Sequence, residues 1–203
     1  MRSFTDWLED TLAAEPLDPR YDPRYRTAWR RFWAGLIDGF LFQPLVWLDG
    51  WIWSAFHTPL LLVPWFVSYS VCFVAYSVLL HWRWGQTLGK RVTGVRVHSL
   101  SGDPLSLRQA AMRDILPLIL SIVGVLIALP DVAQGKNPYP DAAAGLAGIS
   151  TFHRVVLWSS LAWWILEVAT MLSNPKRRAL HDFIAGTVVM RVTPPQSRSG
   201  GGA

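Results

Sequence analysis

Hydrophobic residues are gathered in four long segments of the chain, with shorter polar stretches between them. The segments cover residues 32–56, 60–80, 115–129 and 154–172. A helix needs about 20 apolar residues to cross the hydrocarbon core of a bilayer, and 60–80 supplies 21 residues without a charge. The third segment is shorter and contains Pro117, so its length alone is also compatible with a half-span. The pattern predicts transmembrane helices.

Basic residues alternate across these segments and decide whether the third one crosses. Residues 1–31, 81–114 and 173–203 hold six, six and five Lys or Arg. The intervening connections hold only Lys136, and Arg154 opens the fourth segment. Because cytoplasmic loops carry an excess of Lys and Arg, this distribution predicts four spans with both termini in the cytoplasm. We expect a multi-pass protein of a bacterial cytoplasmic (inner) membrane.

Two polar stretches on the basic side have the pattern of short strands. Residues 92–98 alternate between apolar and polar positions, and 187–192 have the same β-branched character. Between them, 101–104 is a turn sequence and 105–113 is a helix that runs into the third span. A lone strand leaves its backbone groups unpaired, so we expect the two strands to pair. The predicted fold class is an all-α membrane protein, a four-helix transmembrane bundle with a small cytoplasmic β-containing platform.

The same patterns divide the chain into three parts. Residues 1–29 form a cytoplasmic segment, with an amphipathic helix at 3–14 and a tandem repeat at 18–25 that serves as a linker. The polar face of that helix is acidic, so we expect it to dock on the protein's own arginines. Residues 30–192 form the transmembrane domain, and 193–203 form a flexible tail.

Composition agrees with a small membrane protein. Of 203 residues, 51% are hydrophobic and 16% are charged, and the mean hydropathy is +0.25. The net charge of +5 comes mainly from arginines that flank apolar segments, so it indicates orientation in a membrane rather than binding to nucleic acid. The single cysteine, Cys72, excludes an intrachain disulfide. The lipid bilayer is therefore the expected partner, and nucleic acid is not.

The first span carries a charge where charges are costly. Asp38 lies roughly 10 Å into this span at 1.5 Å of rise per residue. A carboxylate at that depth costs on the order of 3 kcal/mol unless it faces protein, water or another charge. Arg31 lies seven residues earlier on the same helix face. Gly35 and Gly39 beside that face have the small-xxx-small spacing that predicts close packing of another helix, from this chain or from a second copy.

Glu167 is a second acidic residue inside a predicted span. It lies roughly 8 to 13 Å from the cytoplasmic end, in the same layer as Asp38. Ser160, Glu167 and Asn174 recur at seven-residue spacing, which makes a polar stripe able to face the stripe of the first span. Near the inner boundary just below, the sequence places five further polar groups: Arg31, Arg113, Asp114, His181 and Asp182.

Three sequence motifs occur in order around this hydropathy pattern. They are Arg31-x-x-Ala34-x-x-Ile37-Asp38, then Gly85-x-Thr87-x-Gly89-Lys90-Arg91-x-x-Gly94-x-Arg96-Val97, then Arg178-Ala179-Leu180-His181-Asp182-x-x-Ala185-Gly186-Thr187-x-Val189. Together they resemble the RDD family of small membrane proteins, named for one arginine and two aspartates. The resemblance covers about 30–192 and maps the name-giving residues onto Arg31, Asp38 and Asp182. It implies transport as the activity, including cation/proton antiport.

The middle motif lacks the spacing of a nucleotide-binding loop. A P-loop has four residues between its first glycine and Gly-Lys, followed by Ser or Thr, whereas this motif has three residues there and continues with Arg91. Its residues are therefore expected to shape the cytoplasmic platform, together with the arginine before the third span: Gly85, Thr87, Gly89, Lys90, Arg91, Gly94, Arg96 and Arg113.

Two roles remain open for the buried polar residues. In one, Asp38 and Glu167 form a site for a monovalent cation or a proton, entered from the cytoplasm. In the other, Arg31 pairs with Asp38 or Asp182 in a structural network, and His181 makes a hydrogen bond to the backbone at a helix end. The corresponding functions are a small transporter of ions or solutes that works as an oligomer, and a non-transporting membrane scaffold or assembly partner. The sequence holds no nucleophile paired with a base and no metal-ligand spacing, so we expect no enzyme activity, no cofactor and no metal.

Overall fold

The computed structural model of the protein describes residues 22–101, 103–139 and 151–192, with side chains in the last range from residue 154 onward. This part of the chain is mostly helical and includes one small sheet. The predicted helix at 3–14 and the tail at 193–203 lie outside the described residues. The elements follow in this order: η1 (Pro23–Tyr25), α2 (Ala28–Ala55), α3 (Pro59–Trp84), α4 (Leu88–Val92), β1 (Val95–Ser99), α5 (Leu107–Arg113), α6 (Ile115–Val132), α7 (Thr151–Ser173), α8 (Leu180–Ala185) and β2 (Thr187–Arg191).

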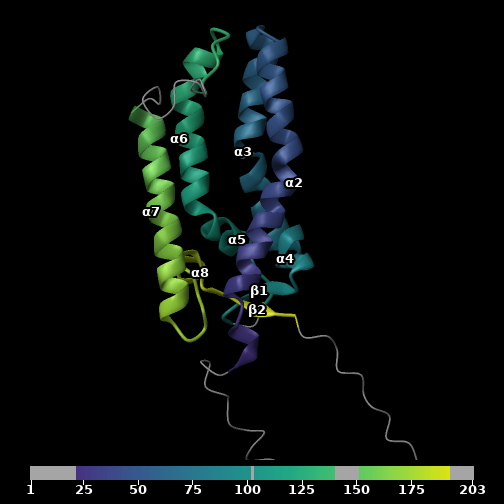
Figure 1. Ribbon diagram of the computed structural model, residues 1–203, viewed down its shortest axis with the longest axis vertical. Coiled ribbons are helices and arrows are strands. Elements are labelled where there is room, and N and C mark those ends of the chain that lie inside the picture. Colours follow the sequence, from purple (N-terminus) through teal and green to yellow (C-terminus); the bar gives the residue numbers. More distant parts are fainter. Residues whose placement is uncertain (1–21, 102, 140–150, 193–203) are drawn as a thin grey trace, which may run out of the picture.

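Four long helices, α2, α3, α6 and α7, run along the length of the molecule (Figure 1). Three of them, α3, α6 and α7, are long and apolar enough to cross a membrane, with mean hydropathies over 18 residues of 1.7, 2.4 and 1.6. α2 is the longest at 28 residues. It is outside this set because Asp38, Gln43 and Asp49 interrupt its apolar run. By helix length and hydropathy, the protein is a multi-pass membrane protein.

The third apolar segment forms a longer helix than its 15 apolar residues predict. α6 has 18 residues, which corresponds to roughly 27 Å at 1.5 Å per residue and matches a full crossing. Pro117 lies in the first turn of α6, where the backbone N–H that proline lacks would have no helical partner. The proline therefore does not interrupt the helix.

The predicted strand pair is confirmed, and it lies at one end of the bundle (Figure 1). β1 and β2 are antiparallel, with the register running from Val95 opposite Arg191 to Ser99 opposite Thr187. The sheet packs with α5 through a small hydrophobic core made of Val95, Val97, Leu105, Ala110 and Val189. We call the group of α4, β1, α5, α8 and β2 the platform, and its end of the bundle the platform end.

The opposite end of the bundle, the far end, joins α2 to α3 and contains residues 133–139 after α6 (Figure 1). A second hydrophobic cluster closes it, made of Trp53, Leu62, Phe66 and Val132. Asp49 is also buried there, and its Oδ1 accepts a 2.8 Å hydrogen bond from Trp65 Nε1. The burial of this aspartate was not predicted from the sequence.

Two short helices, α4 and α8, were not predicted. They have five and six residues, which is too short for a 3.6-residue periodicity to be recognised, and isolated helices of this length are not stable. α4 is capped by Thr87, whose Oγ1 accepts a 3.4 Å hydrogen bond from Lys90 N. Tertiary contacts must therefore supply most of the stability of α4 and α8.

Close helix packing occurs at a different glycine from those expected. A Cβ atom built on Gly35 or Gly39 meets no atom within 4 Å in the described chain, so none of the described helices packs closely there. On Gly89 the same atom would lie 2.1 Å from the Ala34 carbonyl oxygen and 2.9 Å from Asp38 Cγ. α4 therefore touches α2 through backbone, and only glycine fits at position 89.

Candidate functional site

A cavity of about 460 Å³ lies where the four long helices meet the platform. Its wall includes residues of α2, α3, α4, α5, α6, α7 and α8, and most of the polar residues singled out in the sequence face it. The charged and titratable residues that line this cavity, which we call the polar cavity, are Arg31, Asp38, His81, Lys90, Arg113, Asp114, Glu167 and His181.

Asp38 is buried, with 6% of its surface exposed. Its Oδ1 accepts hydrogen bonds from Tyr76 Oη and from Gly89 N, both at 2.8 Å, and its Oδ2 accepts one from Thr87 Oγ1 at 2.6 Å. Three neutral donors thus replace the water that the carboxylate loses on burial. Asp38 binds α2 to α3 and α4, and it makes no ion pair with Arg31 among the described residues.

Asp182 is the fully buried carboxylate of the site. Its Oδ2 lies 2.8 Å from Arg31 Nη1 and accepts a 3.0 Å hydrogen bond from Ala179 N, while its Oδ1 pairs with Arg113 Nη1. Of the two partners expected for Arg31, Asp182 is the one found. Burial alone would raise the pKa of Asp182, but the guanidinium groups of Arg113 and Arg31 hold this pKa well below its usual range.

His181 links this ion cluster to Glu167. Its Nε2 lies 2.9 Å from Arg113 Nη2 and 3.1 Å from Arg31 Nη2. A guanidinium group only donates hydrogen bonds, so Nε2 is unprotonated, and Nδ1 carries the hydrogen that it donates to Glu167 Oε1. Burial, and next the charge of Arg113, lower the pKa of His181. His181 is thus a neutral bridge between side chains, and not the backbone-bonded helix-end residue of the structural alternative.

Glu167 is a partly exposed carboxylate on the cavity wall. Its side chain is 21% exposed, and its Oε2 has no hydrogen-bond partner among the described residues. Asp38 and Glu167 face the same cavity, as the matching polar stripes predict, but no hydrogen bond joins them. The two carboxylates therefore have separate partners and separate environments.

A third polar group was missed in the sequence. On α3, Ser77 and His81 are one helical turn apart and both are buried. Ser77 Oγ donates a 2.8 Å hydrogen bond to Asp114 Oδ2 and lies 3.2 Å from His81 Nδ1, and His81 Nε2 lies 2.5 Å from Lys90 Nζ. The i, i+4 spacing of two polar residues near the end of an apolar span is the signal that could have found them.

The remaining residues of the middle motif lie on the platform outside the cavity lining. Arg91 and Arg96 are exposed. Gly85 ends α3 with a φ of +68°, and a Cβ on it would lie 2.8 Å from the Val97 carbonyl oxygen, so glycine is required where the chain turns into the platform. Gly94 also has a positive φ, +67°.

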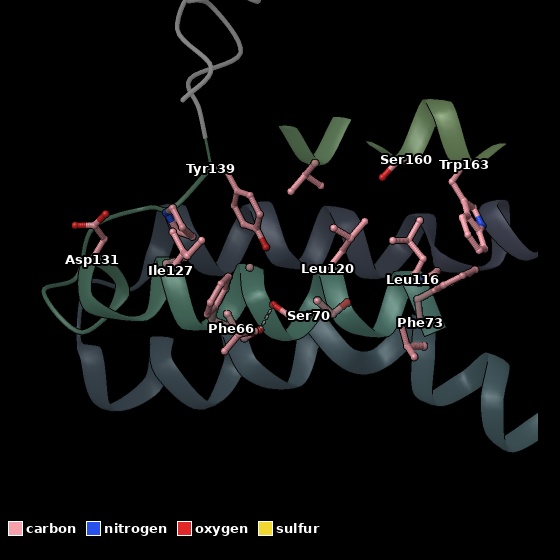
Figure 2. Close-up of a pocket in the computed structure, with 18 residues that line it drawn as sticks. Phe66, Ser70, Phe73, Leu116, Leu120, Ile127, Asp131, Tyr139, Ser160 and Trp163 are labelled. Carbon is pink, nitrogen blue, oxygen red and sulfur yellow. Dashed lines mark hydrogen bonds between the residues drawn. The ribbon is translucent and has the colours of Figure 1, made fainter. Parts of the chain in front are cut away.

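An apolar groove of about 780 Å³ adjoins the polar cavity between α3, α6 and α7 (Figure 2). Figure 2 shows Asp131 at one end of this groove and Trp163 at the other. Phe73, Pro117 and Trp163 line both the groove and the polar cavity. The two spaces therefore adjoin at these three side chains, and the groove continues from there toward the far end.

A family model matches most of this chain. The model described as "RDD family" matches residues 25–186, a range that contains Arg31, Asp38, Asp182 and both the polar cavity and the apolar groove. No curated protein and no solved structure matches the chain.

Proposed function

Because the chain belongs to the RDD family of membrane proteins, we propose that it is a small transporter of ions, and that its reaction is exchange of a monovalent cation for a proton. In this proposal it resides in a bacterial cytoplasmic membrane, with the platform and both termini on the cytoplasmic side. The excess of Lys and Arg in the platform and terminal segments supports that orientation.

The polar cavity, with the open carboxylate of Glu167 on its wall, is the observation that carries the proposal. A transported cation or proton needs a group that binds it and releases it again, and a carboxylate oxygen without a fixed partner can do both. A sealed interior with every charge paired would instead have favoured the scaffold alternative.

The apolar groove supports a route for the ion. It adjoins the polar cavity at Phe73, Pro117 and Trp163, and it contains the hydroxyl groups of Ser70, Ser121 and Ser160. Polar side chains within membrane helices commonly mark ion pathways. A solute that leaves the polar cavity past Trp163 would enter this groove and move toward Asp131 at the far end.

The two intramembrane carboxylates take different roles in this proposal. Glu167 exchanges the ion or proton, because one of its oxygens is open and the other is held by His181. Asp38 keeps α3 and α4 against α2 through three hydrogen bonds, one from Tyr76 and two from Thr87 and Gly89, and so maintains one wall of the cavity. Arg31 and Arg113 keep His181 neutral and oriented toward Glu167.

Flux measurements on Glu167 variants test the proposal. Purified protein is reconstituted in liposomes with an imposed pH gradient, and dissipation of the gradient is followed after addition of Na⁺, K⁺ or Li⁺. Glu167→Gln removes the exchangeable proton while keeping a hydrogen-bond acceptor for His181 Nδ1, so we expect it to abolish the cation-dependent flux. The matched control is Asp103→Asn, which neutralises an exposed carboxyl group outside the cavity.

The possible outcomes separate the two functions. Loss of flux in Glu167→Gln, with wild-type flux in Asp103→Asn and unchanged melting temperatures, supports transport through the cavity. Full flux in Glu167→Gln rejects the assigned role of Glu167. Absence of flux in the wild-type protein for all three cations rejects antiport and favours the membrane scaffold or assembly partner.

A further inference from the structure

Lys90 is a cation in an unusual position. Its Nζ lies 2.5 Å from His81 Nε2, and no carboxylate of the described residues lies within ion-pair distance of Nζ. A buried ammonium group is ordinarily paired with a carboxylate, because desolvation otherwise strongly favours the neutral amine. Lys90 instead faces an imidazole, which is itself a base. Two adjacent bases in a cavity bind a first proton readily, but the charge of that proton makes binding of a second one unfavourable.

Hydrogen bonding fixes where the hydrogens of this group lie. Ser77 has one hydroxyl hydrogen and donates it to Asp114, so its oxygen must accept the bond from His81 Nδ1. The hydrogen of neutral His81 is therefore on Nδ1, and Nε2 accepts from Lys90 Nζ. The four side chains form one chain of hydrogen bonds that runs from Lys90 through His81 and Ser77 to Asp114.

We propose that Lys90 and His81 form a proton-accepting pair on the wall of the polar cavity, and that Ser77 connects this pair to Asp114. The pair takes up one proton and holds it as the Lys90 ammonium group. In the transfer, the ammonium gives a proton to His81 Nε2, His81 Nδ1 gives its proton to Ser77, and Ser77 gives its proton to Asp114. An ammonium and a carboxylate thus become an amine and a carboxylic acid, and no electrons move.

Charges on every neighbouring element act on this pair. α2 contributes Arg31 and Asp38, α5 contributes Arg113, α7 contributes Glu167, and α8 contributes His181 and Asp182. Burial, and next the charges of Arg113 and Arg31, lower the pKa of Lys90 to about 7, while Asp114 and Asp182 act in the opposite direction. The proton occupancy of the pair therefore changes in the neutral pH range.

The use of this pair in antiport rests on the proposed function, whereas its titration does not. In an exchanger, the pair would load a proton on one side of the polar cavity while Glu167 binds the cation on another. Both groups line the same space, so proton uptake at one would oppose or favour cation binding at the other through their charges.

NMR of lysine side chains tests the pair directly. The sequence has only three lysines, Lys90, Lys136 and Lys176, and the last two are exposed. Full-length protein labelled with ¹³C and ¹⁵N at the lysine ε positions is titrated in lipid nanodiscs, and the signal that disappears in Lys90→Met is assigned to Lys90. We expect that signal to titrate near pH 7, whereas exposed lysines titrate near 10.4. A Lys90 signal that remains an ammonium up to pH 9 overturns the proposal.

Stability against pH supplies a second readout. When folding lowers the pKa of a lysine, the unfolded state binds more protons than the folded state at any pH between the two pKa values. The free energy of unfolding therefore increases with pH in that window. From pH 7 to 9.5 we expect the melting temperature of the wild-type protein to rise relative to that of Lys90→Met. Parallel curves for the two proteins overturn the proposal even if Lys90→Met folds less well at every pH.

Ser77→Ala tests the connection to Asp114. This variant removes the only hydroxyl between His81 and Asp114 in the described chain, so proton-coupled flux in liposomes should fall at least tenfold while Lys90 still titrates near pH 7. Undiminished flux in Ser77→Ala rejects the connection. If the wild-type protein carries no flux and Lys90 still titrates near pH 7, the proton-accepting pair is supported and the transport function is rejected.

Discussion

At the scale of single residues, the main polar feature of the platform end is the ion cluster around Asp182. One fully buried carboxylate receives two arginines from different helices, Arg31 from α2 and Arg113 from α5. Taking these charges out of water is costly, and their mutual attraction offsets that cost only while all three are present. His181 Nε2 adds a neutral acceptor for the Nη2 group of each arginine. The cluster therefore fixes the positions of three elements at once.

Removing one arginine of this cluster should destabilise the protein markedly. Arg113→Gln leaves Asp182 buried with a single cationic partner, and loss of one partner of a buried pair costs about 3 to 5 kcal/mol. We expect a clear fall in the melting temperature of the detergent-solubilised protein. Arg108→Gln changes an exposed arginine on the same helix and should have little effect. Equal shifts in the two variants would mean that Asp182 is solvated.

At the scale of elements, the short helix α4 depends on its contact with α2. Five residues cannot form a stable helix alone, and α4 is held by hydrogen bonds from Thr87 and Gly89 to Asp38. Gly89 allows this contact because its backbone lies directly against the Ala34 carbonyl group. Lys90 follows Gly89 in α4, so the same contact places the Lys90 side chain beside His81.

Alanine at position 89 should separate α4 from α2. The added Cβ would meet backbone atoms of Ala34, which cannot move without moving α2. We therefore expect Gly89→Ala to lower the melting temperature. In Gly39→Ala, the matched control, Cβ meets nothing within 4 Å, and alanine improves helix propensity by about 1 kcal/mol, so stability should stay the same or rise. A comparable loss in Gly39→Ala would instead indicate a second copy packed at Gly39, as the small-xxx-small spacing predicts.

At the scale of the whole molecule, the two ends of the bundle differ in chemistry (Figure 1). The platform end holds the ion cluster and the polar cavity, and the far end is closed by an apolar cluster around Trp53 and Phe66. The apolar groove extends from the cavity between them. Which of the two ends faces the cytoplasm stays a prediction from the distribution of basic residues.

Cysteine labelling from each side of the membrane tests this orientation. In a Cys72→Ser background, single cysteines replace Ser54 and Asn137 at the far end and Arg108 in the platform, all of which are exposed. An impermeant reagent added to intact cells should react with positions 54 and 137 and not with 108, because four spans place the platform inside. Reaction of position 137 only after the cells are opened would show that α6 does not cross.

How far the sequence determines this protein depends on the range of the interaction concerned. Hydropathy, polar alternation and basic-residue counts are properties of contiguous segments, so the long helices and the pair of short strands were predictable. The first strand, however, begins at Val95 and not at the predicted residue 92, which ends α4. The short helices α4 and α8 were not, since their stability comes from contacts with distant elements. Arg31 and Asp38 were recognised because a charge beside or inside an apolar segment is costly wherever it lies, whereas Asp182 was singled out by the resemblance to the RDD family.

Only the tertiary structure decided which of these groups meet. Arg31 had two candidate carboxylates, and the position of α8 against α2 gave it Asp182 and left Asp38 to the donors of α3 and α4. The close approach at Gly89, in place of Gly35 and Gly39, depends on where α4 meets α2. The contact of Lys90 with His81 likewise depends on how the chain returns after Gly85. Hydrogen bonds are short and directional, so residue types show that polar groups need partners, and the relative placement of the helices selects those partners.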